Sequence, residues 1–455
     1  MKSISVKDFV SEALENLSTV KIPPVNQKLY KRVFESKKVN VTYLVSHQPI
    51  VYTPGVLSKF IYCPKEGKII YNDADEAVFK IFSLNLNLNK TIEKISKEDI
   101  LQIKQFLKYA YEYCLKILPP KKIENFRLFI EIANKTKEQN FVDYWHQVNS
   151  SFLQTFGISI PNEYKKVSEI DVSSLFEWYI ENYQEINDQY NEAIRIFKQR
   201  MGFYPIKEIS SNETPFWTYE GNTRRTVYVN ERNVKLIRPK AVAWALIRRY
   251  KIYSNVIDIL GIGSSYYTFV SDYIAVNQGH VPPETHIISL TIPLESSQTM
   301  SSLSNLKSTL NGLKSTLNHN PENIPKIFEK LTSLSSGGWE LLDQETQKLS
   351  VSIDNLKQKL SSQDLFSLLD QKNHILHDLN DRSNRKIKKE LTKKLSEINH
   401  LIVSKLDKEI KDIEERLKNL EDKIAKINDV YQTRDYPYFI LSPTQILEFI
   451  RDLEV

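Results

Sequence analysis

A β-branched apolar run that ends in a Gly/Ser turn constrains the fold of this chain more than any other feature. Residues 256–260 form the run, Gly261 and Gly263 lie in the turn, and residues 264–267 begin a helical pattern. A strand followed directly by a helix is the repeating unit of α/β folds that contain a parallel sheet. We therefore expect a strand-to-helix connection at this place.

The same turn is suited to an anion. Two of the chain's 11 glycines lie in it, which lets the backbone approach a ligand and predicts a positive φ at Gly263. The hydroxyls of Ser264 and Ser265, free N–H groups and the dipole of the following helix favour negative charge. Phosphate or carboxylate binding is one interpretation. An ordinary tight connection is the other, because a dinucleotide-binding loop would have a third glycine where Tyr266 stands.

Before residue 300, short β-rich runs alternate with longer helical stretches. The segments 39–45, 68–71, 256–260 and 286–292 read as strands. Between residues 91 and 200, apolar side chains recur at spacings of three and four, which predicts an inserted helical region. This pattern predicts an α/β protein with a largely parallel sheet.

Residues 340–428 contain neither proline nor glycine and carry apolar residues at steps of three and four, as in coiled coils. With a polar turn at residues 380–384, the pattern predicts a long antiparallel helical hairpin. Its two arms of about 40 residues would each reach ~60 Å. We expect the hairpin to be a strut or a dimer contact. The apolar positions are Leu349, Ile353, Leu356, Leu360, Ile410, Ile413, Leu417, Leu420, Ile424 and Ile427.

Composition argues against several classes of protein. The net charge of +6 comes from 62 basic and 56 acidic residues spread along the chain, which makes nucleic acid an unexpected partner. Cys63 and Cys114 provide neither a disulfide framework nor a metal site, as is typical of a reducing compartment. No uninterrupted apolar stretch approaches the ~20 residues that span a bilayer. We expect a cytoplasmic protein of two or three domains that does not associate with membranes.

Polar side chains follow two of the predicted strands. After 39–45 come His47 and Gln48, with Lys59 further along. An imidazole, an amide and an ammonium together suit a phosphate or a developing oxyanion at a strand end. Asp73 and Asp75 follow 68–71, where carboxylates can hold an amine, a hydroxyl or Mg²⁺. The alternatives are that these residues cap loops and helices or face solvent.

Short ordered blocks along the chain resemble the cysteine-adding enzymes of bacillithiol biosynthesis (BshC) and an uncharacterised bacterial branch of that family. Ser46-His47-Gln48-Pro49, with Gly55 and Lys59, is similar to the family's [TS]-G-[HQ]-Q-P…G…K segment, with Ser46 in place of the glycine. A later family block, RP…G-x-[GA]-x-x-x-Y…PP, has similar residues here. They are Arg238-Pro239, Gly261-Ile262-Gly263, Tyr267, Asp272 and Pro282-Pro283.

The resemblance implies a Rossmann-like core related to class I aminoacyl-tRNA synthetases and pantothenate synthetase. It also implies a coiled-coil arm that pairs subunits into a homodimer. The activity implied is that of a ligase joining cysteine or another amino acid to a small acceptor such as glucosaminyl-malate, with ATP or ADP as the candidate cofactor. Two alternatives are a non-catalytic ligand-binding scaffold whose arm meets a partner, and an RNA-binding relative of the synthetases.

This interpretation assigns catalytic roles to His47, Gln48, Lys59, Asp73 and Asp75, and we expect His47, Asp73 and Gly261 to line one crevice. The candidate nucleotide or phosphate site comprises Gly55, Arg238, Gly261, Gly263, Ser264, Ser265, Tyr267 and Asp272. The expected segments are 1–90 and 211–300 for the Rossmann-like core, 91–210 for the helical insertion, 301–428 for the arm and 429–455 for a return to the core.

Overall fold

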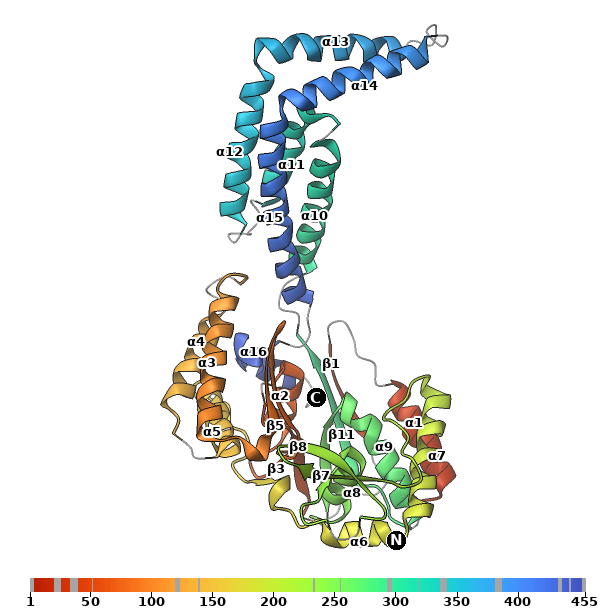
Figure 1. Cartoon of the computed structure of the whole chain (residues 1–455). Coiled ribbons are helices and arrows are strands. Elements are labelled where there is room, and N and C mark those ends of the chain that lie inside the picture. The colour runs from red at the N-terminus through yellow and green to blue at the C-terminus, as the bar shows by residue number, and fades with distance from the viewer. Residues whose placement is uncertain are drawn as a thin grey trace. The chain divides into compact units, whose positions relative to one another are not determined.

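The computed structural model describes residues 4–19, 26–32, 40–50, 52–118, 123–137, 140–231, 234–253, 255–292, 297–317, 319–335, 342–380, 387–432, 436–441 and 443–451. The chain divides into two compact units (Figure 1). The sheet unit comprises Met1–Glu112, Lys121–Ile292 and Arg434–Val455. The helical unit comprises Tyr113–Pro120 and Pro293–Thr433.

A six-stranded sheet forms the centre of the sheet unit. Its order is β1-β11-β10-β2-β3-β6, and every neighbouring pair is parallel except β1 with β11. Five strands thus form a parallel sheet, which confirms the predicted α/β class. The strands are β1 (Asn26–Arg32), β2 (Thr42–His47), β3 (Lys68–Tyr71), β6 (Tyr164–Lys166), β10 (Val256–Gly261) and β11 (Glu284–Thr291).

The four strands expected from the sequence are all present. Segment 68–71 coincides with β3, whereas 256–260 and 286–292 overlap β10 and β11. Segment 39–45 overlaps β2, with residue 39 outside the described residues. Residues 256–260 are at most 6% exposed, as expected of a parallel strand that is covered on both faces.

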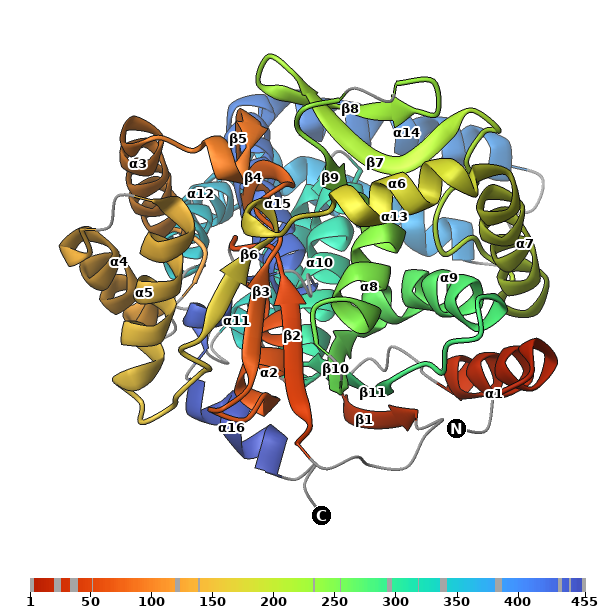
Figure 2. The same cartoon turned by 90° about the horizontal axis from the view of Figure 1, so that it is seen from below.

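The order of the strands creates a switch point between β2 and β10. From β2 the chain adds β3 and then β6 on one side, and it later returns to add β10 and β11 on the other side (Figure 2). In open parallel sheets, the connections on either side of such a point leave the sheet in opposite directions, so that a crevice opens at the carboxyl ends of the strands.

Helices cover both faces of the sheet. One face packs with α1 (Val6–Thr19), α7 (Tyr183–Met201), α8 (Ala241–Tyr250) and α9 (Ile262–Asn277) in one apolar cluster that includes Leu44 and Ile70. Their neighbours along the strands, Val45 and Ile69, are buried outside this cluster, because side chains alternate between faces. Helix α2 (Pro54–Tyr62) packs on β11, β10 and β2, and α16 (Pro443–Arg451) packs on α2.

The predicted helical insertion is present in large part. It contains α3 (Lys97–Cys114), α4 (Glu124–Lys135), α5 (Phe141–Gln154) and α6 (Ser173–Glu181). Within it lies β6, which the sequence analysis assigned to helices. Two small antiparallel sheets were also not predicted. They are formed by β4 (Glu76–Ile81) with β5 (Leu84–Thr91), and by β7 (Glu213–Glu220) with β8 (Thr223–Tyr228) and β9 (Arg238–Pro239).

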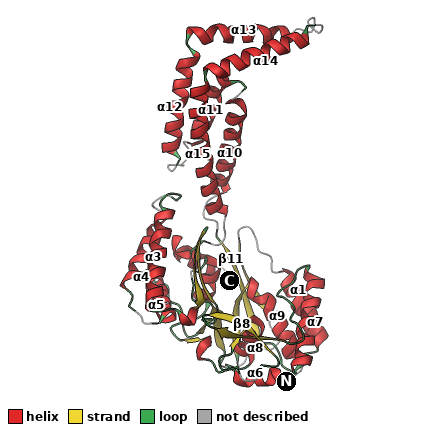
Figure 3. Cartoon of the chain, viewed as in Figure 1, coloured by secondary structure: helices red, strands yellow, loops and turns green. Residues whose placement is uncertain are grey.

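The described part of the helical unit contains helices and no strand (Figure 3). The six long helices are α10 (Ser297–Leu317), α11 (Ile324–Ser335), α12 (Asp343–Leu360), α13 (Gln363–Asn380), α14 (Lys388–Lys405) and α15 (Asp407–Gln432). Helix α15 packs on α12 and α10, and α13 packs on α14. The six predicted apolar positions of α15 are at most 4% exposed, so they form its packing seam.

The arms differ from two uninterrupted helices of about 40 residues. The first is divided between α12 and α13 at Ser361 and Ser362, and the second is divided between α14 and α15 at Leu406. Serine competes with a helix by bonding to nearby backbone groups, which explains the first break. Helices α13 and α14 consequently run across the end of the bundle formed by α10, α11, α12 and α15 (Figure 1). Residues 381–384 of the predicted turn lie outside the described residues.

Within the described residues, no helix combines the length and apolar character needed to cross a membrane.

Candidate functional site

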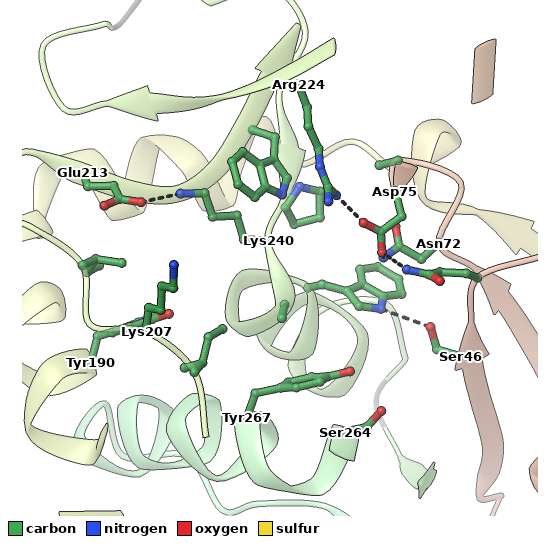
Figure 4. Close-up of a pocket in the computed structure, with 18 of the residues that line it drawn as sticks. Ser46, Asn72, Asp75, Tyr190, Lys207, Glu213, Arg224, Lys240, Ser264 and Tyr267 are labelled. Carbon is green, nitrogen blue, oxygen red and sulfur yellow. Dashed lines mark hydrogen bonds and ion pairs between the residues drawn. The ribbon is translucent and has the colours of Figure 1, made fainter. Parts of the chain in front are cut away.

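A cavity of about 540 Å³ opens in the sheet unit at the switch point between β2 and β10 (Figure 4). Val45 pairs with Ile259 in parallel register, so His47 and Gly261 end neighbouring strands at ~4.8 Å spacing. His47 also pairs with Tyr71 of β3. The cavity is lined by Ser46, His47, Gln48, Asn72, Ala74, Asp75, Tyr190, Ile206, Lys207, Glu208, Ile209, Glu213, Trp217, Arg224, Pro239, Lys240, Ala241, Trp244, Ser264 and Tyr267.

The structure brings five of the sequence-predicted site residues into this cavity: His47, Gln48, Asp75, Ser264 and Tyr267. Three strand-end segments therefore converge, as the sequence analysis expected from the parallel sheet.

Asp73 does not join them. Its carboxylate is 1% exposed and accepts hydrogen bonds from the backbone N–H of Ser168, at 2.9 Å, and from the Ser168 hydroxyl. Burial raises the pKa of Asp73, and the bonds from Ser168 oppose that rise. The expectation that Asp73 lines the crevice was wrong, because its carboxylate is committed to the segment that follows β6.

Asp75 lies in the cavity and is held by three side chains. The amides of Gln48 and Asn72 donate to its Oδ2, the latter at 3.3 Å, and the guanidinium of Arg224 donates to its Oδ1. The carboxylate thus ties the end of β2 to the β3–β4 turn and to β8. Because both oxygens already have partners, Asp75 has little capacity left for a metal ion or a substrate amine.

His47 faces the cavity as a neutral imidazole. Burial, together with the charge of Lys59, lowers the pKa of His47 to about 3. Its Nδ1 lies 3.0 Å from the carbonyl oxygen of Gln48, and a carbonyl only accepts, so Nδ1 carries the proton. The lone pair of the imidazole is therefore on Nε2, which can accept a proton or a hydrogen bond.

Helix α9 begins at this cavity. Gly261 is its N-cap residue, with φ −87° and ψ 169°, and provides no side-chain cap. Gly263 lies inside the helix, has no positive φ, and has no atom within 4 Å of the position that a Cβ would occupy. The expectation of a positive φ at Gly263 was wrong, because the helix begins one residue after Gly261. Ser265 is buried and donates to the Ile262 carbonyl at 2.6 Å, whereas Ser264 faces the cavity.

Three more predicted residues lie away from the cavity. Gly55 allows α2 to approach β11, since a Cβ there would lie 2.8 Å from the Leu290 carbonyl oxygen. Arg238 pairs with Glu93 at 2.9 Å. Asp272 is fully buried, pairs with Arg249 at 3.0 Å and accepts from the Tyr250 hydroxyl. Their partners explain these residues as structural elements of the sheet unit.

The residues of the opposite wall of the cavity were not predicted as site residues from the sequence. Lys240 donates to Glu213 at 2.7 Å, and its ammonium lies 4.3 Å from the ring centre of Trp217. The guanidinium carbon of Arg224 lies 4.9 Å from the centre of the same ring. Trp244 donates to the Ser46 hydroxyl at 3.1 Å. The signal that could have identified part of this wall is the pair of strand-like runs at 213–228, in which Trp217 and Arg224 lie.

Several polar groups in the cavity have no hydrogen bond or ion pair with the described residues. They are the ammonium of Lys207 and the hydroxyls of Tyr190, Ser264 and Tyr267. All four can donate, whereas the carboxylates of Asp75, Glu208 and Glu213 are already paired with cations. A cavity with unpaired donors and engaged acceptors fits a ligand that is rich in acceptors, such as a carboxylate or a phosphate.

No protein-family model matches this chain, and a search of curated proteins gives no match either.

Proposed function

We propose that the sheet unit is a condensing enzyme similar to the cysteine-adding enzymes of bacillithiol biosynthesis, joining cysteine or another amino acid to a small anionic acceptor. The observation that carries this proposal is the convergence of His47, Gln48, Asp75, Ser264 and Tyr267 on one switch-point cavity. His47 and Gln48 come from the first block on which the sequence resemblance rests, Ser264 and Tyr267 lie in the second, and Asp75 belongs to neither. A ligand cavity at this place is typical of parallel α/β sheets.

The proposed chemistry uses the neutral His47. The amine of the acceptor would attack the carboxyl carbon of the amino acid, so that a C–N bond forms, a carboxyl C–O bond breaks, and the oxygen leaves as water or, with ATP, on phosphate. The Nε2 of His47 would accept the proton that the amine gives up, while the unpaired donors of the cavity hold the negative charge of the acceptor. With a pKa of about 3, His47 is a weak base in the free protein. A bound anion would raise this pKa by favouring the imidazolium, so the acceptor would activate the base.

A nucleotide is the proposed cofactor. The Rossmann-like relationship and the start of α9 at the cavity support a phosphate of ATP or ADP beside Ser264. In this proposal the chain works in the cytoplasm, where its two buried cysteines remain thiols.

The proposed role of the helical unit is that of a coiled-coil arm that pairs subunits into a homodimer. Its support is the set of large apolar side chains that α12 to α14 expose, which would be covered in a dimer. They include Val351 at 62% exposure and Phe366 at 69%, together with Leu376, Ile387 and Leu401.

A non-catalytic ligand-binding scaffold is the second candidate, and one observation favours it. Asp75 is the one candidate catalytic carboxylate that lines the cavity, and both of its oxygens are engaged by neighbouring side chains. Such a carboxylate organises a binding site rather than taking part in acid–base catalysis.

Product analysis separates the two candidates. The full chain is incubated with cysteine and glucosaminyl-malate, with and without ATP, and the mixture is analysed by mass spectrometry. The enzyme proposal expects a product with the summed mass of the two substrates less one water. His47→Gln should slow its formation at least ~100-fold, whereas His374→Gln, at an exposed position of the helical unit, should not. Ligand-induced thermal stabilisation without product would favour the scaffold.

A further inference from the structure

Lys59 is a buried ammonium without a counter-ion of its own. The side chain is 2% exposed, and no hydrogen bond or ion pair joins it to a residue that the structure describes. It extends from α2 over the end of β10, where a Cβ at Gly261 would lie 3.8 Å from Lys59 Cδ. Gly261 is also the residue that caps α9, so the lysine reaches the start of that helix.

The charged groups around Lys59 do not neutralise it. His47 of β2 is neutral, and Arg248 of α8 adds a second positive charge. Asp258 of β10 attracts Lys59, but its Oδ2 is bound by Arg248 at 3.1 Å and by Arg249 at 2.8 Å. Its Oδ1 has no hydrogen-bond partner, so Lys59 does not reach that oxygen.

An unpaired buried ammonium is unfavourable. Burial, with the nearby charge of Arg248, lowers the pKa of Lys59 to about 7. The buried charge of Lys59 therefore destabilises the folded protein, and a bound anion would reduce this destabilisation.

The first turn of α9 lacks acceptors as well. The leading N–H groups of a helix have no partner within the helix, and Gly261 has no side chain to cap them. The positive end of the helix dipole lies at the same place. The space beside Gly263 is open, and the Ser264 hydroxyl points into the cavity (Figure 4).

We propose that Lys59, the first-turn amides of α9 and the Ser264 hydroxyl form a subsite for one oxyanion, a carboxylate or a phosphate group, at the start of α9, where Ser264 lines the cavity. This rests on the proposed function in one respect, since it names the acidic group by which the substrate or nucleotide of that cavity is held. It does not depend on turnover, because an anion can bind there in a protein that catalyses nothing.

The first test uses Lys59→Met, which keeps the length of the side chain and removes the charge. In anion-free buffer the variant should melt at a higher temperature than the parent, because the unpaired ammonium is gone. Inorganic phosphate should stabilise the parent, whereas its affinity for Lys59→Met should be at least tenfold weaker in calorimetry. A variant that melts lower than the parent and binds phosphate equally well would overturn the proposal.

The matched control is Lys372→Met in the helical unit. Lys372 is also buried, at 3% exposure, but it donates to Glu322 at 2.7 Å and to Asn320 at 2.9 Å. Its replacement should lower the melting temperature of the helical unit and leave phosphate binding unchanged. The melting temperature should rise in Lys59→Met and fall in Lys372→Met, and this difference distinguishes an unpaired ammonium from a paired one.

A second variant approaches the subsite from the helix. Gly263→Asp places a carboxylate in the open space at the first turn of α9, where a negative side chain is favourable. It should raise the melting temperature and abolish phosphate binding by occupying the subsite from within. Parent-like phosphate affinity in this variant would contradict the proposal even if Lys59→Met failed to fold.

The two sources of the oxyanion are distinguished by comparing inorganic phosphate with malonate. Tighter phosphate binding that depends on Lys59 assigns the subsite to a nucleotide phosphate, and tighter malonate binding assigns it to the carboxylate of a substrate. Binding of neither anion overturns the subsite. Anion binding without a condensation product leaves the subsite intact and removes the enzyme proposal, so the two failures can be told apart.

Discussion

At the scale of single residues, the chemistry of the cavity depends on which polar groups are already paired. Asp75 and Lys240 lie in the cavity with their charges satisfied by Arg224 and Glu213. His47 and Lys59 are different. Burial lowers the pKa of His47, so the imidazole is neutral, and it lowers the pKa of Lys59, so the neutral amine is favoured. Perturbed groups of this kind cluster at functional sites, and these two belong to the same sequence block.

The depressed pKa of His47 predicts a pH-dependent contribution to stability. Above pH 6.5 the imidazole is neutral in both states. Between pH 6.5 and about 3 the unfolded chain takes up a proton and the folded chain does not, so stability falls as the pH falls through this window. The parent should lose on the order of 1–2 kcal/mol more than His47→Asn over this range, after solvent screening is allowed for.

Denaturant unfolding of both proteins between pH 7 and pH 3 measures this difference. Parallel stability curves for the parent and His47→Asn would mean that the imidazole titrates in the same way in the folded and unfolded chains. That result would contradict the partly buried, neutral histidine on which the proposed proton transfer depends.

At the scale of elements, the segments that follow β2, β3 and β10 form the site. Helix α2 starts at a Thr53 cap with Pro54 in its first turn, and Gly55 lets it lie close to β11. This packing carries Lys59 to the end of β10, where α9 begins. The helical unit is built differently, since α15 buries one apolar seam against α12 and α10.

The seam of α15 should carry stability and assembly but no chemistry. Replacing Leu417 and Leu420, which are at most 1% exposed, with Asp places two charges in it, at several kcal/mol each unless they are neutralised. The helical unit should lose its packing, and any dimer should dissociate in light scattering. Phosphate binding by the sheet unit should be kept.

The control for this prediction is the double variant Lys418→Asp, Asn419→Asp, at two exposed positions of the same helix. It should change the circular dichroism and the assembly state little. Loss of phosphate binding in the seam variant, with the sheet unit still folded, would show that the helical unit helps to form the site.

At the scale of the whole molecule, local sequence patterns predicted the parallel sheet because its strands contain short β-branched apolar runs, such as 256–260, which only Asp258 interrupts. They did not predict β6, a strand of three residues with two lysines, or the two small sheets, β4 with β5 and β7 with β8 and β9. Strands β6 and β9 are defined by tertiary pairing rather than by their own pattern. The alternation of Leu and Asn at 84–89 does indicate a strand, and it could have revealed β5.

The candidate site could likewise be predicted only in part. Strand-end residues such as His47 and Ser264 could be placed together, because parallel strands share one carboxyl edge. Trp217, Lys207 and Lys240 could not, since none of them lies at the end of a strand of the parallel sheet. Asp73 and Asp75 are two residues apart, yet Asp73 bonds to Ser168 and Asp75 lines the cavity, because tertiary partners rather than the local sequence place each carboxylate.

We propose that the switch-point cavity is where this protein binds its substrate. The most direct measurement is a crystal structure of the full chain soaked with glucosaminyl-malate. We expect ligand density inside the cavity, with an acidic group at the start of α9 beside Ser264 and Lys59. Ligand bound elsewhere on the chain, with the cavity empty at a concentration that stabilises the protein in solution, would contradict it.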